Sequence, residues 1–405
     1  MPGKNIFSEL KVLDLSTSVV GPGAARLFAD YGATVVKVES MTHPEALRTS
    51  PPYPTGKRGV NLSGYYSHFN AGKLSLSLNL NLPRARELIL RLVKWADVVV
   101  ESFTTGIMER WELTYERLRE IKPAVIMVST NMLGQVGPHR SFRGYGQHGA
   151  ALAGWDTTLG YPDHEPVLAF GAYTDYIASR YVAIAILAAL DYRRRTGQGQ
   201  YIDISQVESS IDFMTPLILQ YGASGQMMKP DANRDPQAAP HGAYKCRGED
   251  SWCAIAVASQ EQWRAFCRAL AKPEWVDDPR FASLEDRKKN EDELDKLVEK
   301  WTLTHTAEEV VRLLQKEGVP AGVVQSAREL VSDPQLAHRG HFQRRPHPEM
   351  GLHNYETFGF RLSEVQGGPQ GPAPCLGEHT NYVCTEILKL TDEEFVELLS
   401  EGVLE

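Results

Sequence analysis

The stretch LKVLDLSTSVVGPGAARLFADYGATVVKVE (10–39) decides the fold, because two short apolar runs in it flank a segment with helical spacing. Leu10–Leu15 and Ala33–Glu39 have the length and composition of buried strands, and Ala24–Asp30 has the spacing of a helix between them. A strand, a helix and a further strand in this order predict a βαβ unit.

The same alternation of apolar strands and amphipathic helices continues to about residue 206. Runs such as DVVVE (97–101) are continuously apolar, which is typical of parallel strands that helices cover on both faces. The first half of the chain is therefore predicted to be a doubly wound α/β domain. Its further expected strands are Leu74–Asn81, Asp97–Glu101, Ala124–Ser129 and QYIDIS (200–205), and its further expected helices are Pro83–Trp95 and Tyr115–Ile121.

A change in composition marks the end of this domain. Gly222–Ala239 is rich in Gly, Pro and Asn and poor in large apolar residues, so it is expected to be a linker. A smaller α/β unit follows, and the chain beyond Pro320 is expected to be irregular up to a helical tail at Asn381–Leu399. The expected strands of the small unit are Ala243–Cys246 and Trp252–Ala256, and its expected helices are Gln260–Ala271, Glu291–Thr302 and Ala307–Glu317.

Composition argues against several classes of protein. A chain of 405 residues with 42% hydrophobic content can bury a large core in two or more domains. Its net charge of −8 gives no field that attracts nucleic acid. The start MPGKNIFSEL has no basic and then apolar leader, and the apolar helix around Tyr181–Leu190 is too short to span a bilayer, so we expect a cytoplasmic protein without a membrane partner. Five cysteines without a CxxC pair argue against a disulfide scaffold or a zinc site.

Gly21-Pro22-Gly23 stands between the first strand and the first helix, where a doubly wound sheet presents backbone N–H groups to a phosphate or nucleotide. Arg26 occupies the place of the third glycine of a dinucleotide fingerprint, and Glu39 is the only equivalent of the ribose-binding acid. A nicotinamide enzyme is therefore disfavoured. The glycines fit either a loop that lines a ligand or a purely structural turn.

Asp175 lies between a turn at Gly171 and an amphipathic helix. One interpretation is structural, because Asp175 or Thr174 is a good N-cap for that helix. The other is chemical, because a carboxylate at a helix N-terminus is held rigidly, is ionised at neutral pH and can attack an acyl thioester. The apolar residues that would line one face of the helix are Ile177, Tyr181, Ile184, Leu187 and Leu190.

Seven motifs are spread along nearly the whole chain. They are the opening stretch 10–39, ADVVVESFTTGIMERW (96–111), the Asp175 stretch leading to ILAAL, RRTGQGQYIDIS (194–205), PHGAYKC (240–246), EGVPAGVV (317–324) and LGEHT (376–380). In these motifs and their order the chain resembles the class III CoA-transferases, the CaiB/BaiF family of formyl-CoA transferase, carnitine CoA-transferase and the α-methylacyl-CoA racemase relatives.

The resemblance implies a large Rossmann-like CoA-binding domain built from residues 1–221 and from residues 331–405, which return to it. A small α/β domain at 222–330 would lie between these parts, and two chains would interlock as a homodimer or as a heteromer with a homologous subunit. Coenzyme A would be a substrate carrier, and no metal or redox cofactor is implied.

The resemblance also implies roles for individual residues. Asp175 matches the aspartate that forms the CoA thioester in the transferases. The family often has a basic residue where Ser40 follows VKVE, and an Asn where Ser102 follows ADVVVE. Because of these two departures, the adenine-phosphate contacts are expected to be distributed differently, to Lys37 or Arg48. The residues expected along CoA or the substrate are Val19, Val20, Lys73, Phe103, Arg110, Arg143 and Tyr145.

Three functions are compatible with this family. A racemase needs a His opposite the aspartate as a second proton donor, but RGYGQHG has Tyr145 at that place, the residue type of the transferases, with His148 three positions later. A CoA-binding subunit of a heteromeric transferase is the third possibility, and Asp175 argues against a silent subunit. A transferase that moves CoA from succinyl-CoA to a carboxylic acid is favoured.

The acceptor acid is indicated only by the overall pattern. The motifs taken together resemble those of the subunits of succinyl-CoA:benzylsuccinate CoA-transferase from anaerobic toluene breakdown, and this resemblance implies an aryl-substituted acid such as benzylsuccinate. The aromatic residues expected near the nucleophile are Tyr145, Phe170, Tyr173 and Tyr176.

Overall fold

The computed structural model describes residues 5–405, which divide into two compact units. The large unit comprises the chain up to Thr157, Leu168–Met228 and His338–Glu405, and the small unit comprises Thr158–Val167 and Lys229–Ala337. These transitions lie close to the boundaries expected at residues 222 and 331. Residues 158–167 join the small unit, although the sequence placed them in the large domain. The functional labels of the two domains remain predictions.

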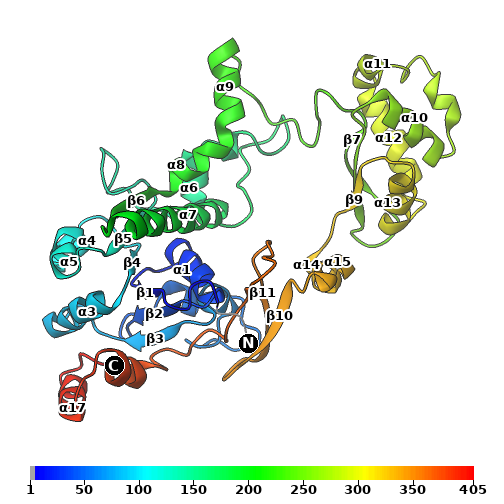
Figure 1. The fold of residues 1–405 in the computed structure, drawn as a ribbon. Helices are drawn as coiled ribbons and strands as arrows, with labels where there is room; N and C mark the ends of the chain where they lie inside the picture. Colours follow the sequence, from blue (N-terminus) through cyan, green and yellow to red (C-terminus); the bar gives the residue numbers. More distant parts are fainter. Residues whose placement is uncertain (1–4) are drawn as a thin grey trace. The chain divides into compact units, whose positions relative to one another are not determined.

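A six-stranded parallel sheet forms the centre of the large unit (Figure 1). The strand order β3-β2-β1-β4-β5-β6 is the doubly wound order, in which the direction of winding reverses between β1 and β4. The predicted parallel α/β sheet is therefore confirmed. Its strands are β1 (Lys11–Asp14), β2 (Thr34–Glu39), β3 (Leu74–Ser77), β4 (Val98–Glu101), β5 (Ile126–Asn131) and β6 (Tyr201–Ser205).

Each face of this sheet has its own apolar core, because successive side chains of a strand point to opposite faces. Val12 of β1 packs in the core under α1 (Val20–Asp30) and α7 (Tyr173–Thr196). The next residue, Leu13, packs in the core under α3 (Pro83–Trp95) and α5 (Tyr115–Ile121). Helices α3 and α5 have the expected bounds.

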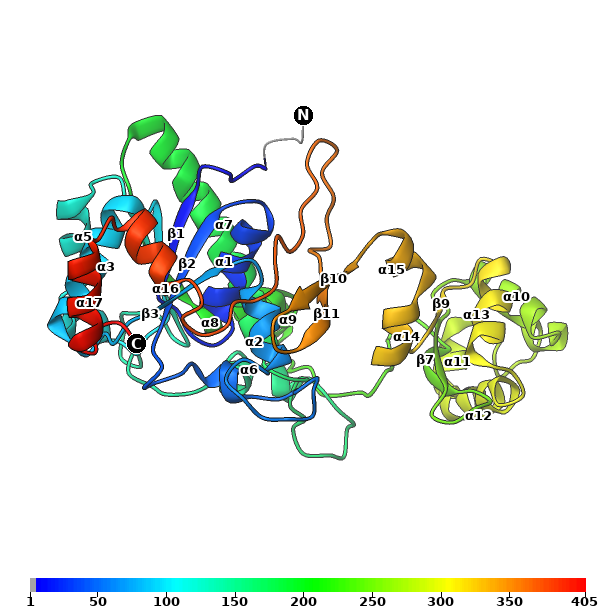
Figure 2. The same cartoon turned by 90° about the horizontal axis from the view of Figure 1, so that it is seen from below.

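The C-terminal segment completes the second core. The backbone N–H of His379 donates to the carbonyl of Ser75 at 2.9 Å, which anchors the segment to β3. Helix α17 (Asp392–Ser400) lies beside α3 in Figure 2, and Arg84 of α3 pairs with Glu397 at 2.9 Å. Residues 338–405 therefore belong to the same unit as the N-terminal strands.

The tail expected to be helical at Asn381–Leu399 is helical in two parts with a break between them. The tail consists of α16 (Thr380–Tyr382), a π-helical turn (Val383–Ile387) and α17. Lys389 interrupts it with a positive φ of 55°, and Thr391 then starts α17 as its N-cap by accepting a hydrogen bond from the N–H of Glu394.

The expectation of irregular chain after Pro320 is wrong. This region contains β9 (Ala321–Val323), α14 (Ala327–Ser332), α15 (Pro334–His338) and the antiparallel pair β10 (Phe342–His347) and β11 (Gly351–Glu356). The strands FQRRPH and GLHNYE carry too few apolar residues for a strand period to be visible in the sequence.

The small unit contains an antiparallel sheet of β7 (His241–Lys245), β8 (Trp252–Ala256) and β9. Its core gathers around Trp263, Phe266 and Phe281. Its helices are α10 (Gln260–Ala269), α11 (Leu284–Lys289), α12 (Glu291–Thr302) and α13 (Ala307–Lys316).

Several short helices of the large unit were not expected from the sequence. They are α2 (Gly64–Asn70), α4 (Ile107–Arg110), α6 (Gly146–Leu152), α8 (Gln206–Ile211) and α9 (Thr215–Ser224). Across residues 5–405, no helix combines the length and the apolar character needed to cross a membrane.

Candidate active site

A cavity of about 490 Å³ opens in the large unit at the carboxyl ends of the strands, where the winding reverses between β1 and β4. Ligands of doubly wound sheets bind at this point. The walls come from the loops after β1, β4 and β5, from residues 140–146, and from Asp175 and Gln206.

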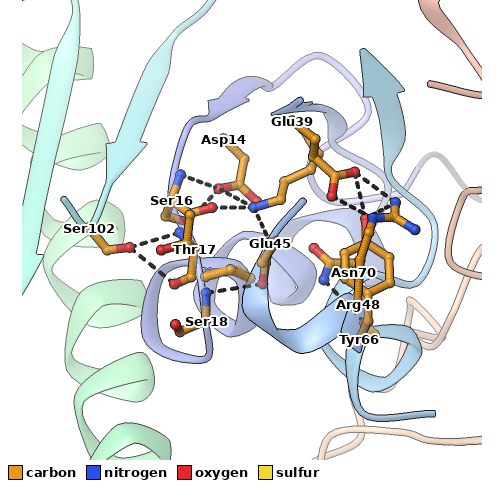
Figure 3. A network of polar contacts seen from close by, with 12 residues as sticks. Asp14, Ser16, Thr17, Ser18, Glu39, Glu45, Arg48, Tyr66, Asn70 and Ser102 are labelled. Carbon is orange, nitrogen blue, oxygen red and sulfur yellow. Dashed lines mark hydrogen bonds and ion pairs between the residues drawn. The ribbon is translucent and has the colours of Figure 1, made fainter. Parts of the chain in front are cut away.

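A network of buried and half-buried polar side chains holds the loop after β1 in place (Figure 3). Asp14 accepts a hydrogen bond from the backbone N–H of Ser16 at 3.0 Å. Ser102 accepts from the N–H of Thr17 at 2.8 Å and donates to the carbonyl of Thr17 at 3.1 Å. The serine that departs from the family's usual Asn thus binds both backbone groups of a residue that lines the cavity.

Ser18 has a left-handed backbone with φ of 64°. A non-glycine residue adopts this conformation only where its surroundings fix it. Here the carboxylate of Glu45 accepts the N–H of Ser18 at 3.0 Å, and Lys37 pairs with Glu45 at 2.9 Å. The network therefore sets the conformation of the loop that carries Val19 and Val20 into the wall of the cavity.

The cations near this loop are engaged by buried carboxylates. Lys73 pairs with Asp14 at 2.7 Å and is fully buried, and burial lowers the pKa of Lys73 to about 8 although Asp14 opposes this shift. Arg48 pairs with both oxygens of Glu39, at 2.7 and 2.8 Å. Lys37 and Arg48 therefore both have buried acidic partners, and the expectation that one of them contacts the phosphates of CoA stays a prediction.

Asp175 is the third residue of α7, and Ala172 is the N-cap. The N-cap interpretation of Asp175 and Thr174 is wrong, since neither side chain caps the helix. Burial raises the pKa of Asp175 to about 6, while a hydrogen bond from Gln206 to its Oδ1 atom lowers it. The carboxylate is therefore mostly ionised at pH 7, next to the positive end of the helix dipole.

Two glycines of α6 allow this helix to lie against the start of α7. A Cβ atom built on Gly146 would lie 2.7 Å from Oδ1 of Asp175 and 2.7 Å from Cβ of Ala172. The carbonyl of Gly146 accepts the hydroxyl of Thr174 at 2.7 Å. A Cβ atom on Gly149 would lie 3.1 Å from the same hydroxyl oxygen.

The structure brings most of the predicted site residues together. Lys73 is not among the lining residues, because its side chain is buried beneath the loop, and Arg110 ends α4 as an exposed residue outside the cavity. His148 accepts the N–H of Tyr145 at 3.2 Å at the start of α6. The predicted residues that line the cavity with Asp175 are Val19, Val20, Phe103, Arg143 and Tyr145.

The aromatic residues expected near Asp175 are only partly at the cavity. Tyr145 lines it, together with Phe103 and Phe142, whereas Phe170 is 100% exposed and outside the lining. Tyr173 and Tyr176 are also exposed and lie outside the cavity lining.

Gln206 and Arg140 also line the cavity and were not predicted from the sequence. Gln206 directly follows β6, so the available signal was its place at the carboxyl end of a predicted strand. A second, more apolar cavity of about 220 Å³ shares Thr17 and Phe103 with the first and extends over β2 and β3 to Leu78 and Trp111.

Comparison with known proteins gives a consistent result. The model of the family described as CoA-transferase family III matches residues 7–380. Succinyl-CoA–D-citramalate CoA-transferase of Chloroflexus aurantiacus is 31% identical over 398 residues, 98% of each chain. Succinyl-CoA:mesaconate CoA-transferase of Haloarcula marismortui is 31% identical over 387 residues, 94% of this chain and 96% of that protein. A solved CaiB/BaiF family protein from Brucella suis has a TM-score of 0.87 and 30% identity, covering 95% of this chain and 100% of that one.

Proposed function

Because the chain belongs to CoA-transferase family III and is a CoA-transferase, we propose that it moves CoA from succinyl-CoA to a second carboxylic acid through a thioester on Asp175. One observation carries the assignment of the nucleophile. Among the described residues that line the cavity, Asp175 is the only carboxylate. A nucleophilic carboxylate must be ionised, accessible to the substrate and fixed in orientation, and Asp175 meets these three requirements.

The proposed reaction balances with the groups of the enzyme and its substrates alone. Oδ2 of Asp175 attacks the thioester carbonyl of succinyl-CoA, the C–S bond breaks, and a mixed anhydride and CoA thiolate result. The thiolate attacks Cγ of Asp175 and expels succinate, which leaves an aspartyl-CoA thioester. The acceptor carboxylate then attacks Cγ and expels the thiolate, which attacks the acceptor's acyl carbon and restores the Asp175 carboxylate.

We assign the pantetheine of CoA to the first cavity, along Val19 and Val20 of the loop after β1. The second cavity adjoins it at Phe103, and we assign the adenine ring to it, because Phe103 and Trp111 offer aromatic faces in the same cavity as polar residues such as Asn81. Arg143 lines the first cavity and supplies a guanidinium for a phosphate or a carboxylate. Exposed Arg110 remains a candidate phosphate contact outside the cavity.

The acceptor that we propose is a dicarboxylic acid. The relatives are named for D-citramalate and mesaconate, which are dicarboxylic acids, and Arg140 lines the cavity beside Arg143. Phe103, Phe142 and Tyr145 line the same cavity and favour an aryl-substituted member of this class, such as benzylsuccinate. Incubation with succinyl-CoA and a panel of dicarboxylic acids, followed by mass spectrometry of the CoA esters, would identify the acceptor.

We further propose that the active form contains a second copy of this chain. Helix α9 has no buried residue, although it carries exposed Ile218, Leu219 and Tyr221. An exposed apolar helix of this kind marks a protein–protein interface. Light scattering should give a dimer for the wild type and for Val396→Glu, an exposed apolar site on α17, and a monomer for Leu219→Glu. A monomeric wild type that becomes active only with a homologous subunit would replace the homodimer by a heteromer.

The nucleophile is tested by trapping. Hydroxylamine should convert activated Asp175 to a hydroxamate after incubation with succinyl-CoA, and peptide mass spectrometry should find the modification there. Asp175→Ala should abolish both trapping and the exchange of labelled succinate into succinyl-CoA. Asp191→Asn, an exposed carboxylate on the same helix, is the matched control and should retain both. Exchange at the wild-type rate in Asp175→Ala would refute the assigned nucleophile.

A further inference from the structure

We propose that Gln206 is a catalytic residue of this transferase, which fixes Asp175 for attack and donates a hydrogen bond to the oxyanion that forms on Asp175 itself. The inference rests on the proposed aspartyl-CoA mechanism and adds a residue to it. Gln206 is the first residue of α8, is only 5% exposed, and lines the cavity beside Asp175.

The hydrogen bonds around Gln206 determine which end of its amide faces the nucleophile. The amide nitrogen Nε2 lies within hydrogen-bond distance of Oδ1 of Asp175, and it donates to Oγ1 of Thr174 at 2.9 Å. An ionised carboxylate can only accept. Thr174 donates its own hydrogen to the carbonyl of Gly146 at 2.7 Å, so its oxygen is also an acceptor toward Gln206. Both neighbours therefore require a donor, and both hydrogens of Nε2 are used.

This arrangement makes the two oxygens of Asp175 unequal. Oδ1 is held by Gln206, whereas Oδ2 accepts no hydrogen bond from any residue in the range 5–405. Oδ2 therefore keeps its lone pairs for attack on the thioester carbonyl. A Cβ atom at Gly146 would touch Oδ1, so the same oxygen is also packed against the backbone of α6.

The same hydrogen bond has a second role after the attack. When the CoA thiolate adds to Cγ, the C–Oδ1 double bond opens and its electron pair moves onto Oδ1. When the acceptor carboxylate adds to the thioester, the pair moves onto Oδ1 again. Nε2 already points at this atom in the resting enzyme, so the donor is in place before either oxyanion forms. Removing one such preorganised donor costs roughly 10²–10³-fold in rate.

The test uses the exchange of labelled succinate into succinyl-CoA, which requires only the donor half of the reaction. Gln206→Met retains the length of the side chain and removes the donor. We expect its kcat for exchange to fall roughly 10²–10³-fold, with KM for succinyl-CoA nearly unchanged. Because Gln206 lowers the pKa of Asp175, the acidic limb of the pH–rate profile should also move to higher pH in this variant. Loss of structure alone would not move that limb.

Two further variants, Thr174→Val and Asp175→Ala, distinguish a failure of the inference about Gln206 from a failure of the proposed function. Thr174→Val removes the second partner of the amide, and its effect should be smaller than that of Gln206→Met and less than additive with it. Unchanged melting of Gln206→Met would show that its loss of rate is not a loss of folding. Exchange by Gln206→Met at more than about a tenth of the wild-type rate, with an unmoved acidic limb, would overturn the inference about Gln206. Exchange at the wild-type rate by Asp175→Ala would instead overturn the proposed function.

Discussion

Gly146 offers a sharp test of how tightly Asp175 is packed. In Gly146→Ala, the new methyl carbon would lie 2.7 Å from Oδ1 and 2.8 Å from Cγ of Asp175. Carbon and oxygen atoms in contact need more than 3 Å, so the carboxylate must move by roughly half an ångström or more. Its hydrogen bond with Gln206 would be disturbed by the same movement.

A displacement of about 1 Å at a reacting group can cost on the order of 10²-fold in rate. We therefore expect kcat for succinate exchange to fall roughly 10–10²-fold in Gly146→Ala, with little change in KM for succinyl-CoA. Helix propensity does not oppose the change, because Ala is a better helix former than Gly, although the full preference of about 1 kcal/mol holds only inside a helix and Gly146 is the first residue of α6. A lower rate would thus not reflect an intrinsically weaker helix α6.

The assay is the exchange reaction, with thermal melting measured in parallel. Gly322→Ala in β9 is the matched control, because a Cβ atom there meets no other atom within 4 Å. Wild-type kcat in Gly146→Ala would refute the packing argument. Equal losses in Gly146→Ala and Gly322→Ala would refute it as well, since the effect would then not depend on contact with Asp175.

Three further predictions follow from the same contacts. The rate of exchange should fall as pH falls through about 6, because the raised pKa of Asp175 leaves progressively less of the attacking carboxylate; a flat profile between pH 5 and 7 would contradict this. Lys73→Met should lower the free energy of unfolding in urea by about 1–3 kcal/mol, because it removes the 2.7 Å partner of the buried Asp14 carboxylate while Lys37, at 4.0 Å, still compensates its charge; unchanged stability would show that the Lys73–Asp14 pair is not needed. Ser102→Ala should raise KM for succinyl-CoA more than it lowers kcat, because it frees the backbone of Thr17, which lines both cavities. Steady-state kinetics that show a lower kcat with an unchanged KM would mean that this loop contacts only the reacting centre.

The sequence was sufficient to predict the sheet and the candidate nucleophile. Continuous apolar runs such as VVVE in β4 occur where helices cover both faces, so the parallel sheet follows from local patterns. Asp175 was identifiable because it lies at the start of a long helix within a family motif. The hairpin of β10 and β11 was missed because its strands are polar, and the break in the tail depends on the positive φ of Lys389.

The partners of Asp175 could not be predicted in the same way, because they are distant in sequence. Gln206 is 31 positions from Asp175, and no local pattern in QVESSI distinguishes it from any other glutamine at the start of a helix. Its function depends on topology. The parallel sheet places the carboxyl end of β6 beside the start of α7, and only this placement brings the amide to the carboxylate.

The sequence-based predictions for the basic residues were the least reliable, and the reason is electrostatic. A cation buried without a partner costs several kcal/mol, so the basic residues around the loop after β1 are paired with carboxylates. Lys37 therefore pairs with Glu45, Lys73 pairs with Asp14, and both pairs stabilise the loop after β1. Arg143, by contrast, lines the cavity and forms no ion pair with an acidic residue within 5–405. Burial, which a sequence motif does not reveal, thus separates the cations that shape the site from those able to meet an anionic substrate.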